Sequence, residues 1–140
     1  MQGHRRFGSW LAVLLLAPLL GCAGFLGDKR ESVEDAIEDY STFLRWGALD
    51  RAKVFVEPLK RPEFMAFFET GRPYQFTAVE VGTIDYDADT LMATSPVRFT
   101  LYRLTQATLT TIVDVQRWRY DPDGGWLVDP DLDTFRSSSR

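Results

Sequence analysis

The spacing of apolar residues changes twice along this chain and divides it into three parts. Residues 10–20 are almost continuously apolar. From there to about residue 70, apolar residues recur every three or four positions, which is the period of an amphipathic helix. From residue 74 onward they alternate with polar residues, as in a strand with two unlike faces. The pattern predicts a leader, a helical part and a sheet, in that order.

The helical part contains three predicted helices. The first begins at Ser32, whose hydroxyl can accept a backbone N–H, and ends at Gly47, a residue suited to the position after a helix. Two shorter helices are expected over 48–56 and 63–70, separated by a break that contains proline. The apolar stripe of the first helix contains Val33, Ala36, Ile37, Tyr40, Phe43 and Leu44.

The sheet part contains four predicted strands, over residues 74–84, 91–104, 108–120 and 126–128. The run Asp121-Pro122-Asp123-Gly124-Gly125 predicts a hairpin turn between the last two strands. The segment 85–89 has aspartate at alternate positions, as at the start of a calcium-binding loop. It lacks the glycine and the closing glutamate of such a loop, so a hairpin turn is the better interpretation. Residues 131–140 are expected to form a disordered tail.

Helices followed by an antiparallel meander indicate an α+β domain over residues 32–130, with N-terminal helices packed on a curved antiparallel sheet of about four strands. The order resembles the nuclear transport factor 2-like superfamily of cystatin-like α+β folds. The resemblance is carried by Ala48-Leu49-Asp50-Arg51-Ala52 and by Val115-Gln116-Arg117-Trp118-Arg119-Tyr120. It implies a cone with a pocket between helix and sheet, and no fixed activity. The alternative fold is another helix-on-sheet sandwich with fewer helices.

The leader has the features of an export signal. Arg5 and Arg6 precede an apolar run that is too short to span a membrane, for which about 20 residues are needed. Leu19-Leu20-Gly21-Cys22 resembles the lipobox of bacterial prolipoproteins. That resemblance implies cleavage after Gly21 and a lipid on Cys22. The alternative is an ordinary secreted protein with an incidental thiol.

We therefore expect residues 1–21 to be a signal peptide, and residues 22–31 to be a lipidated cysteine with a flexible tether. The mature chain would be anchored in the bacterial cell envelope. Ala23, rather than an acidic residue, follows the cysteine, and in Gram-negative bacteria this favours the outer membrane, facing the periplasm.

Loss of the leader changes the composition of the mature chain in two ways. The net charge falls from −4 to −6, because Arg5 and Arg6 are removed, and an acidic chain without a basic run is a poor ligand for nucleic acid. The only histidine, His4, is removed as well. This excludes Ser-His-Asp chemistry and His-ligated metal sites, and we expect neither a metal nor a cofactor.

Asp114 is the one acidic residue in the middle of a long predicted strand. If its side chain faces the cone, burial would raise its pKa and make it a candidate catalytic base. If it faces outward, it is a solvated residue that can pair with Arg98 or Arg103. A ligand pocket in the cone would be lined by aromatic residues, which are equally suited to a core: Tyr40, Trp46, Phe64, Phe68, Tyr102 and Trp118.

These observations favour a membrane-anchored lipoprotein that acts as a non-catalytic binding or assembly module, because no catalytic constellation is present. Its partner would be an envelope protein or a small apolar ligand. Two alternatives stay open. One is a small cofactor-free enzyme, similar to an isomerase or dehydratase, that uses Asp114. The other is a structural envelope protein that forms a homodimer.

Overall fold

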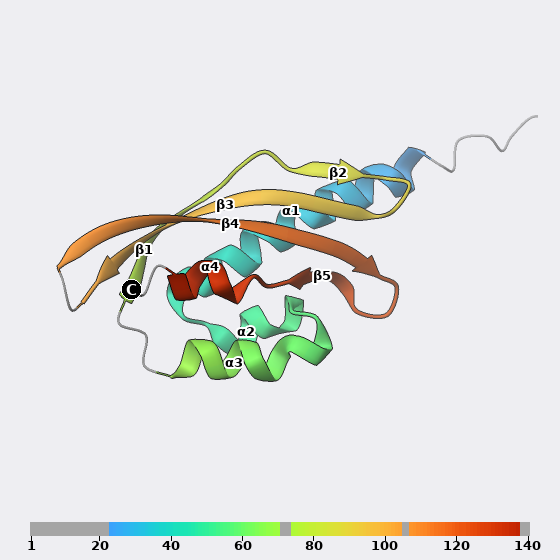
Figure 1. Ribbon diagram of the computed structural model, residues 1–140. Coiled ribbons are helices and arrows are strands. Elements are labelled where there is room, and N and C mark those ends of the chain that lie inside the picture. The colour runs from blue at the N-terminus through green and yellow to red at the C-terminus, as the bar shows by residue number, and fades with distance from the viewer. Residues whose placement is uncertain (1–22, 71–73, 105–106, 138–140) are drawn as a thin grey trace, which may run out of the picture.

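A computed structural model describes residues 23–70, 74–104 and 107–137 and shows helices followed by a curved antiparallel sheet of five strands (Figure 1). The predicted α+β class is confirmed. The helices are α1 (Ala23–Trp46), α2 (Leu49–Ala52), α3 (Arg61–Glu69) and α4 (Leu132–Ser137), with two 3₁₀ turns, η1 (Lys53–Phe55) and η2 (Pro58–Lys60). The strands are β1 (Tyr74–Val81), β2 (Asp85–Asp87), β3 (Met92–Arg103), β4 (Thr108–Asp121) and β5 (Gly125–Asp129).

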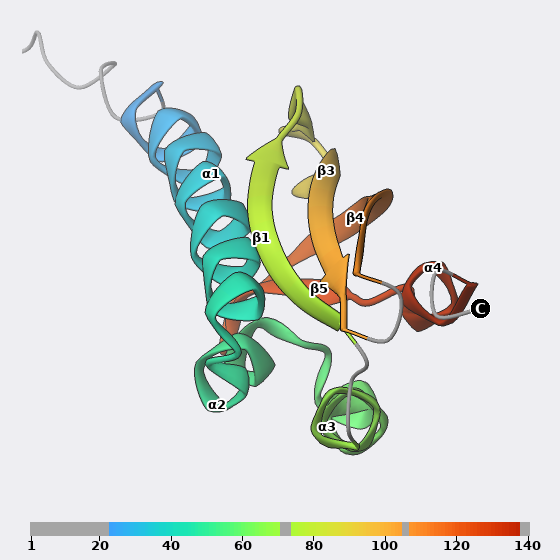
Figure 2. The same ribbon diagram turned by 90° about the vertical axis from the view of Figure 1, so that its left-hand side faces the viewer.

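The sheet has the order β1-β3-β4-β5, and β2 pairs with β3. It is open and curved, consistent with a cone, and α1 runs along β1 (Figure 2). Beyond β5, Val56 forms a single parallel bridge with Val128, and the N–H of Glu57 donates to the carbonyl of Val128 at 3.0 Å. The segment between η1 and η2 therefore covers the β5 edge.

Helix α1 is longer than the sequence pattern predicts. It begins at Ala23, so the prediction of a flexible tether up to residue 31 is wrong for this segment. Ser32 lies inside the helix, and its hydroxyl accepts a hydrogen bond from the Trp126 indole at 2.9 Å. The Lys29 ammonium lies 3.7 Å from the centre of the Tyr120 ring. These contacts join the start of α1 to the sheet, which sequence periodicity does not reveal.

The end of α1 agrees with the prediction. Gly47 has a φ of 69°, a left-handed conformation that favours glycine, and its N–H donates to the carbonyl of Leu44 at 3.1 Å. The second predicted helix is shorter than expected, because only α2 is α-helical and η1 follows it. Helix α3 begins at Arg61, with proline in its first turn.

The first predicted strand, over residues 74–84, is shorter than expected, and a further short strand follows it. β1 ends at Val81, and the short strand β2 lies in the segment expected to be only a turn. At the break, the N–H of Gly82 donates to the carbonyl of Pro96 at 2.8 Å. A hairpin does form, but its turn lies at residues 88–91 rather than 85–89. The Asp87 carboxylate accepts the N–H of Asp89 at 2.9 Å and closes the turn to β3.

The C-terminal part also differs from the prediction. Residues 132–137 form α4 rather than a disordered tail, because Leu132 and Phe135 are buried. The Phe135 ring packs against four other rings, from α3, β1 and β3. Two apolar residues at helical spacing are enough to dock this short helix once an aromatic layer is present to receive it.

Candidate ligand-binding site

The inner face of the sheet, which is the face that packs against the helices, is mostly apolar in β3 and partly polar in β4. In β4 the buried positions are Ile112, Asp114, Gln116 and Trp118. Val113 and Val115 lie on the outer face and are each 47% exposed. The centre of β4 therefore has the reverse of the usual arrangement, with polar residues buried and apolar residues exposed.

Asp114 faces inward and is 2% exposed. Burial raises the pKa of its carboxyl from 3.8 to about 7, opposed by a hydrogen bond from Gln116. The nearby charge of Asp131 raises this pKa further, and that of Arg117 lowers it. Within the described residues, the Oδ1 atom of Asp114 has no hydrogen-bond partner. A buried acceptor without a partner is rare in a folded protein and indicates a place for a ligand or a water molecule.

Asp114 belongs to a set of buried groups that we call the inner polar cluster: Tyr40, Ser41, Ser95, Asp114, Gln116 and Trp118. The Trp118 indole donates to the Gln116 amide oxygen at 3.1 Å. The Gln116 amide nitrogen lies 3.4 Å from the Ser41 hydroxyl. Burial, and then the charge of Asp114, raise the pKa of Tyr40 well above its ordinary value. The Ser95 hydroxyl, opposite Gln116 in the register, has no partner in the described part of the chain.

A cleft of about 390 Å³ opens where α1 and α3 end and β1 begins. Its exposed wall is Trp46, which is 72% exposed, with the Arg45 guanidinium 5.0 Å from the Trp46 ring centre. We call this the aromatic cleft. It is lined by Arg45, Trp46, Gly47, Phe68, Glu69, Tyr74, Gln75 and Phe76.

The six aromatic residues predicted to line a pocket fall into three places. Tyr40, Phe64 and Trp118 are in the core, where the Tyr40 ring lies 6.3 Å from Phe64 and 5.6 Å from Trp118. Trp46 and Phe68 line the aromatic cleft. Tyr102, by contrast, is on the outer face of β3.

The structure joins the cleft and the core through aromatic rings, because Phe68 lies 4.9 Å from Phe64. Sequence reasoning did not assign Tyr74 and Phe76 to a pocket. The signal that identifies them is their alternation at the start of β1, which places both on the inner face near the end of α1.

A second cleft, of about 300 Å³, is lined mainly by charged residues: Lys60, Glu63, Arg117, Asp129, Pro130, Asp131, Leu132, Asp133 and Arg136. Several of these charged side chains form ion pairs with one another. Lys60 pairs with Asp129, and Arg136 pairs with Glu63 at 3.1 Å. In the part of the chain that the structure describes, no group of His, Cys, Asp and Glu is arranged to hold a metal ion.

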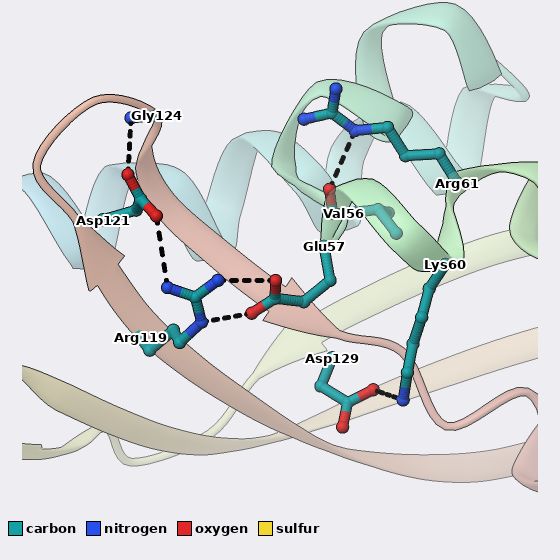
Figure 3. A network of polar contacts seen from close by, with 8 residues as sticks. All are labelled: Val56, Glu57, Lys60, Arg61, Arg119, Asp121, Gly124 and Asp129. Atoms are coloured by element: carbon teal, nitrogen blue, oxygen red, sulfur yellow. Dashed lines mark hydrogen bonds and ion pairs between the residues drawn. The ribbon is translucent and has the colours of Figure 1, made fainter.

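A neighbouring network of ion pairs has a structural role (Figure 3). Arg119 on β4 contacts both oxygens of Glu57, one of them at 2.7 Å, and lies 3.3 Å from Asp121. Asp121 in turn accepts the N–H groups of Asp123 and Gly124 in the hairpin turn, and these hydrogen bonds lower the pKa of its carboxyl. The network holds the segment after η1 against β5.

Comparison with known proteins gives no further assignment, since no family model, no curated protein and no solved structure matches this chain. None of the helices in residues 23–70 and 107–137 is long and apolar enough to cross a membrane.

Proposed function

We propose that this protein is a lipid-anchored lipoprotein of the bacterial cell envelope that binds a small apolar ligand in the aromatic cleft, without catalysis. The observation that carries the binding role is the cleft itself, with an exposed tryptophan at its edge. Its volume falls within the range of about 300–1,000 Å³ that is typical of small-molecule sites. Four aromatic side chains line it: Trp46, Phe68, Tyr74 and Phe76.

The charges at the cleft favour a ligand that is apolar overall. Arg45 and Glu69 contribute one positive and one negative charge to the lining, so neither sign dominates. The exposed Trp46 ring favours a planar apolar molecule through ring contact and burial of its surface, whereas Phe68, Tyr74 and Phe76 are each at most 6% exposed.

The anchor that we propose, a lipid on Cys22, would hold the cleft away from the membrane. Helix α1 begins at the next residue and contains 24 residues, so it is about 36 Å long at 1.5 Å per residue. The aromatic cleft lies at the other end of α1, at Trp46. The ligand site would therefore be presented at a distance from the lipid surface.

The binding role can be tested with the fluorescent apolar probe N-phenyl-1-naphthylamine. Titration of the full chain should give a saturable rise in probe fluorescence, and Trp46→Ala should weaken binding about tenfold or more, because an exposed aromatic wall is lost. Leu59→Ala is the matched control, since Leu59 is 96% exposed and lies outside the cleft. Equal affinity in both variants would contradict the assignment of the site.

The anchor is tested by labelling cells with radioactive palmitate. The wild type should incorporate label and fractionate with the outer membrane of a Gram-negative host, whereas Cys22→Ala should do neither. Labelling that persists in Cys22→Ala would show that the lipid is attached elsewhere.

A second candidate function is catalysis by Asp114, which is favoured by its burial beside Tyr40 and by a pKa of about 7. A carboxylate base of this kind would move a proton next to a carbonyl group. Isomerisation of a β,γ-unsaturated cyclohexenone, followed by absorbance, provides the test. Turnover that rises through pH 7 and is lost in Asp114→Asn would support the enzyme, while equal rates in the two proteins would exclude Asp114 as the base.

A homodimer is the third possibility, and it is favoured by exposed apolar residues on the outer face of β4: Leu109, Val113 and Val115. Light scattering of the purified protein measures its mass directly. A dimer that dissociates in Val115→Asp would assign this face to self-association, and a monomeric wild type would remove this possibility.

A further inference from the structure

Helix α4 lies near α3 (Figure 1) and packs through Phe135 against α3 and the inner face of the sheet. Its residue Phe135 is 1% exposed and is surrounded by aromatic rings. The distances from the centre of the Phe135 ring are 6.5, 5.5, 6.1 and 5.7 Å to the rings of Phe67, Phe68, Phe76 and Phe99. This single side chain therefore fills an aromatic site made by α3, β1 and β3.

The outer side of α4 is held by charged groups. Arg136 pairs with Glu63 on α3 at 3.1 Å and with Asp133 on its own helix at 2.6 Å. All three side chains are largely exposed, and exposed ion pairs contribute little to stability. A helix of six residues is not stable on its own, so its buried apolar residues supply most of the free energy that holds it against the rest of the protein.

Two buried polar atoms that the described residues do not satisfy lie on the same inner face of the sheet as Phe99. Asp114 pairs in the register with Val97, so it is the diagonal neighbour of Phe99, against which Phe135 packs. Its Oδ1 atom has no partner, nor has the hydroxyl of Ser95 on the same inner face. An unused acceptor thus lies at the strand position diagonal to Phe99, one wall of the aromatic site.

We propose that α4 closes a second, internal binding site whose ligand is a small neutral phenol. The phenol ring takes the place of the Phe135 ring, and its hydroxyl donates a hydrogen bond to Asp114 Oδ1. A phenol matches both observations, because it provides a planar ring for the aromatic walls and one donor for the unused acceptor. The internal site shares the Phe68 and Phe76 rings with the aromatic cleft, but Trp46 and Arg45 take no part in it.

The experiment uses phenol and toluene, which differ by the hydroxyl group, with the full chain at pH 8, where Asp114 is mostly ionised. Phenol should bind at least tenfold more tightly than toluene, because a hydrogen bond to a charged acceptor is stronger than one between neutral groups. Asp114→Leu, which keeps the same branched shape and number of side-chain heavy atoms without the acceptor, should abolish this difference. Equal binding of the two compounds to the wild type would overturn the proposal.

Displacement of α4 is measured separately by amide hydrogen exchange. A bound ligand normally slows exchange in the elements around it, but here phenol should make the amides of residues 132–137 exchange at least fivefold faster and those of β4 more slowly. Unchanged or slower exchange in α4 would overturn the proposal. It would show that phenol does not bind, or binds elsewhere, and that water is the partner of the buried oxygens.

Phe135→Ala provides a variant in which the site is already vacant. Phenol should bind it at least tenfold more tightly than it binds the wild type, because no ring has to be displaced. Phe43→Ala is the matched control, since Phe43 is a partly buried ring that packs against Phe55 beside the core and is not one of the four rings placed around Phe135 above. The same affinity in Phe135→Ala as in the wild type would count against the proposal.

Trp46→Ala should leave phenol binding unchanged, so failure of the aromatic cleft and failure of the internal site are distinguishable.

Discussion

The neighbouring strands β3 and β4 place their apolar residues differently. In β3 the buried face contains Val97, Phe99 and Leu101, and the opposite face is polar at Arg98. In the centre of β4 the buried face is polar and the outer face is apolar. The first strand follows the usual hydrophobic pattern, and the second reverses it. Proteins tend to break such local rules at functional sites, and this difference marks the centre of β4 as the part of the sheet to examine.

The reversal in β4 is a matter of register. A shift of one residue would bury Val113 and Val115 and expose Asp114 and Gln116, but it would also turn the large Trp118 side chain outward. Trp118 is almost fully buried and donates a hydrogen bond to Gln116. Burial of this indole, together with pairing to β3 along twelve positions, outweighs the cost of the polar residues.

The largest effect is expected in β3, where the pattern is regular. Phe99→Ala should lower the free energy of unfolding by about 3–5 kcal/mol, because a fully buried ring is replaced by a cavity. Denaturant unfolding followed by circular dichroism measures the change. Thr100→Ala, at the next position on the other face, is the control and should have a much smaller effect. Comparable losses in the two variants would mean that the faces are not as distinct as the structure shows.

The centre of β4 should make stability depend on pH. The pKa of Asp114 is raised from 3.8 to about 7 in the folded state, so the folded protein binds more protons than the unfolded chain between these values. The stabilising contribution of the protonated carboxyl is therefore fully present below about pH 4 and is lost as the pH rises to about 7. Over this pH range the free energy of unfolding falls by about 4 kcal/mol.

Asp114→Asn is the test of this dependence, because the amide does not titrate. Unfolding measured across pH 4–8 should show a downward slope in the wild type that is much reduced in the variant. If both proteins gave the same profile, another group would be responsible, and Asp114 would not be the buried acid that distinguishes β4 from β3.

A smaller effect is expected where β3 meets the break between β1 and β2. A Cβ atom added at Gly82 would lie 2.7 Å from the carbonyl oxygen of Pro96, closer than side chains normally approach a backbone. Gly82→Ala should therefore destabilise the protein by about 1–3 kcal/mol. Gly124→Ala is the matched control, because its nearest neighbour would be at 3.8 Å. A neutral Gly82→Ala would show that this break in the sheet can relax.

The smallest effect is expected on the outer face of β4. Val115→Thr should change the free energy of unfolding by no more than about 0.5 kcal/mol, because the side chain is half exposed and threonine suits a strand. Val97→Thr, on the inner face of β3, should cost about 1–3 kcal/mol by burying a hydroxyl. A large loss in Val115→Thr that depends on protein concentration would instead indicate that a second copy covers this face.

Much of the fold could be predicted from local patterns. The helical stripe of Val33, Ile37 and Leu44 is buried, Gly47 ends α1, and the glycine-containing turn joins β4 to β5. Each of these features depends on contacts between residues close in sequence, on the spacing of apolar residues, or on the conformational freedom of glycine. The two ends of the domain could not be predicted in this way, because their contacts are with distant rings: Lys29, before Ser32, lies over Tyr120, and Phe135 of α4 packs against Phe99.

The sequence by itself determined the α+β order, the alternation of faces and the identity of Asp114 as the acidic residue to examine. Only the tertiary structure decided which face of β4 is buried. Alternate residues along a strand point to opposite faces, but the alternation does not say which face is inside, and the register is set by pairing with the neighbouring strand. The same holds for the predicted pocket. Trp46 and Phe68 meet at the aromatic cleft while Tyr102 points to the other face, since distance along the chain does not fix distance in space.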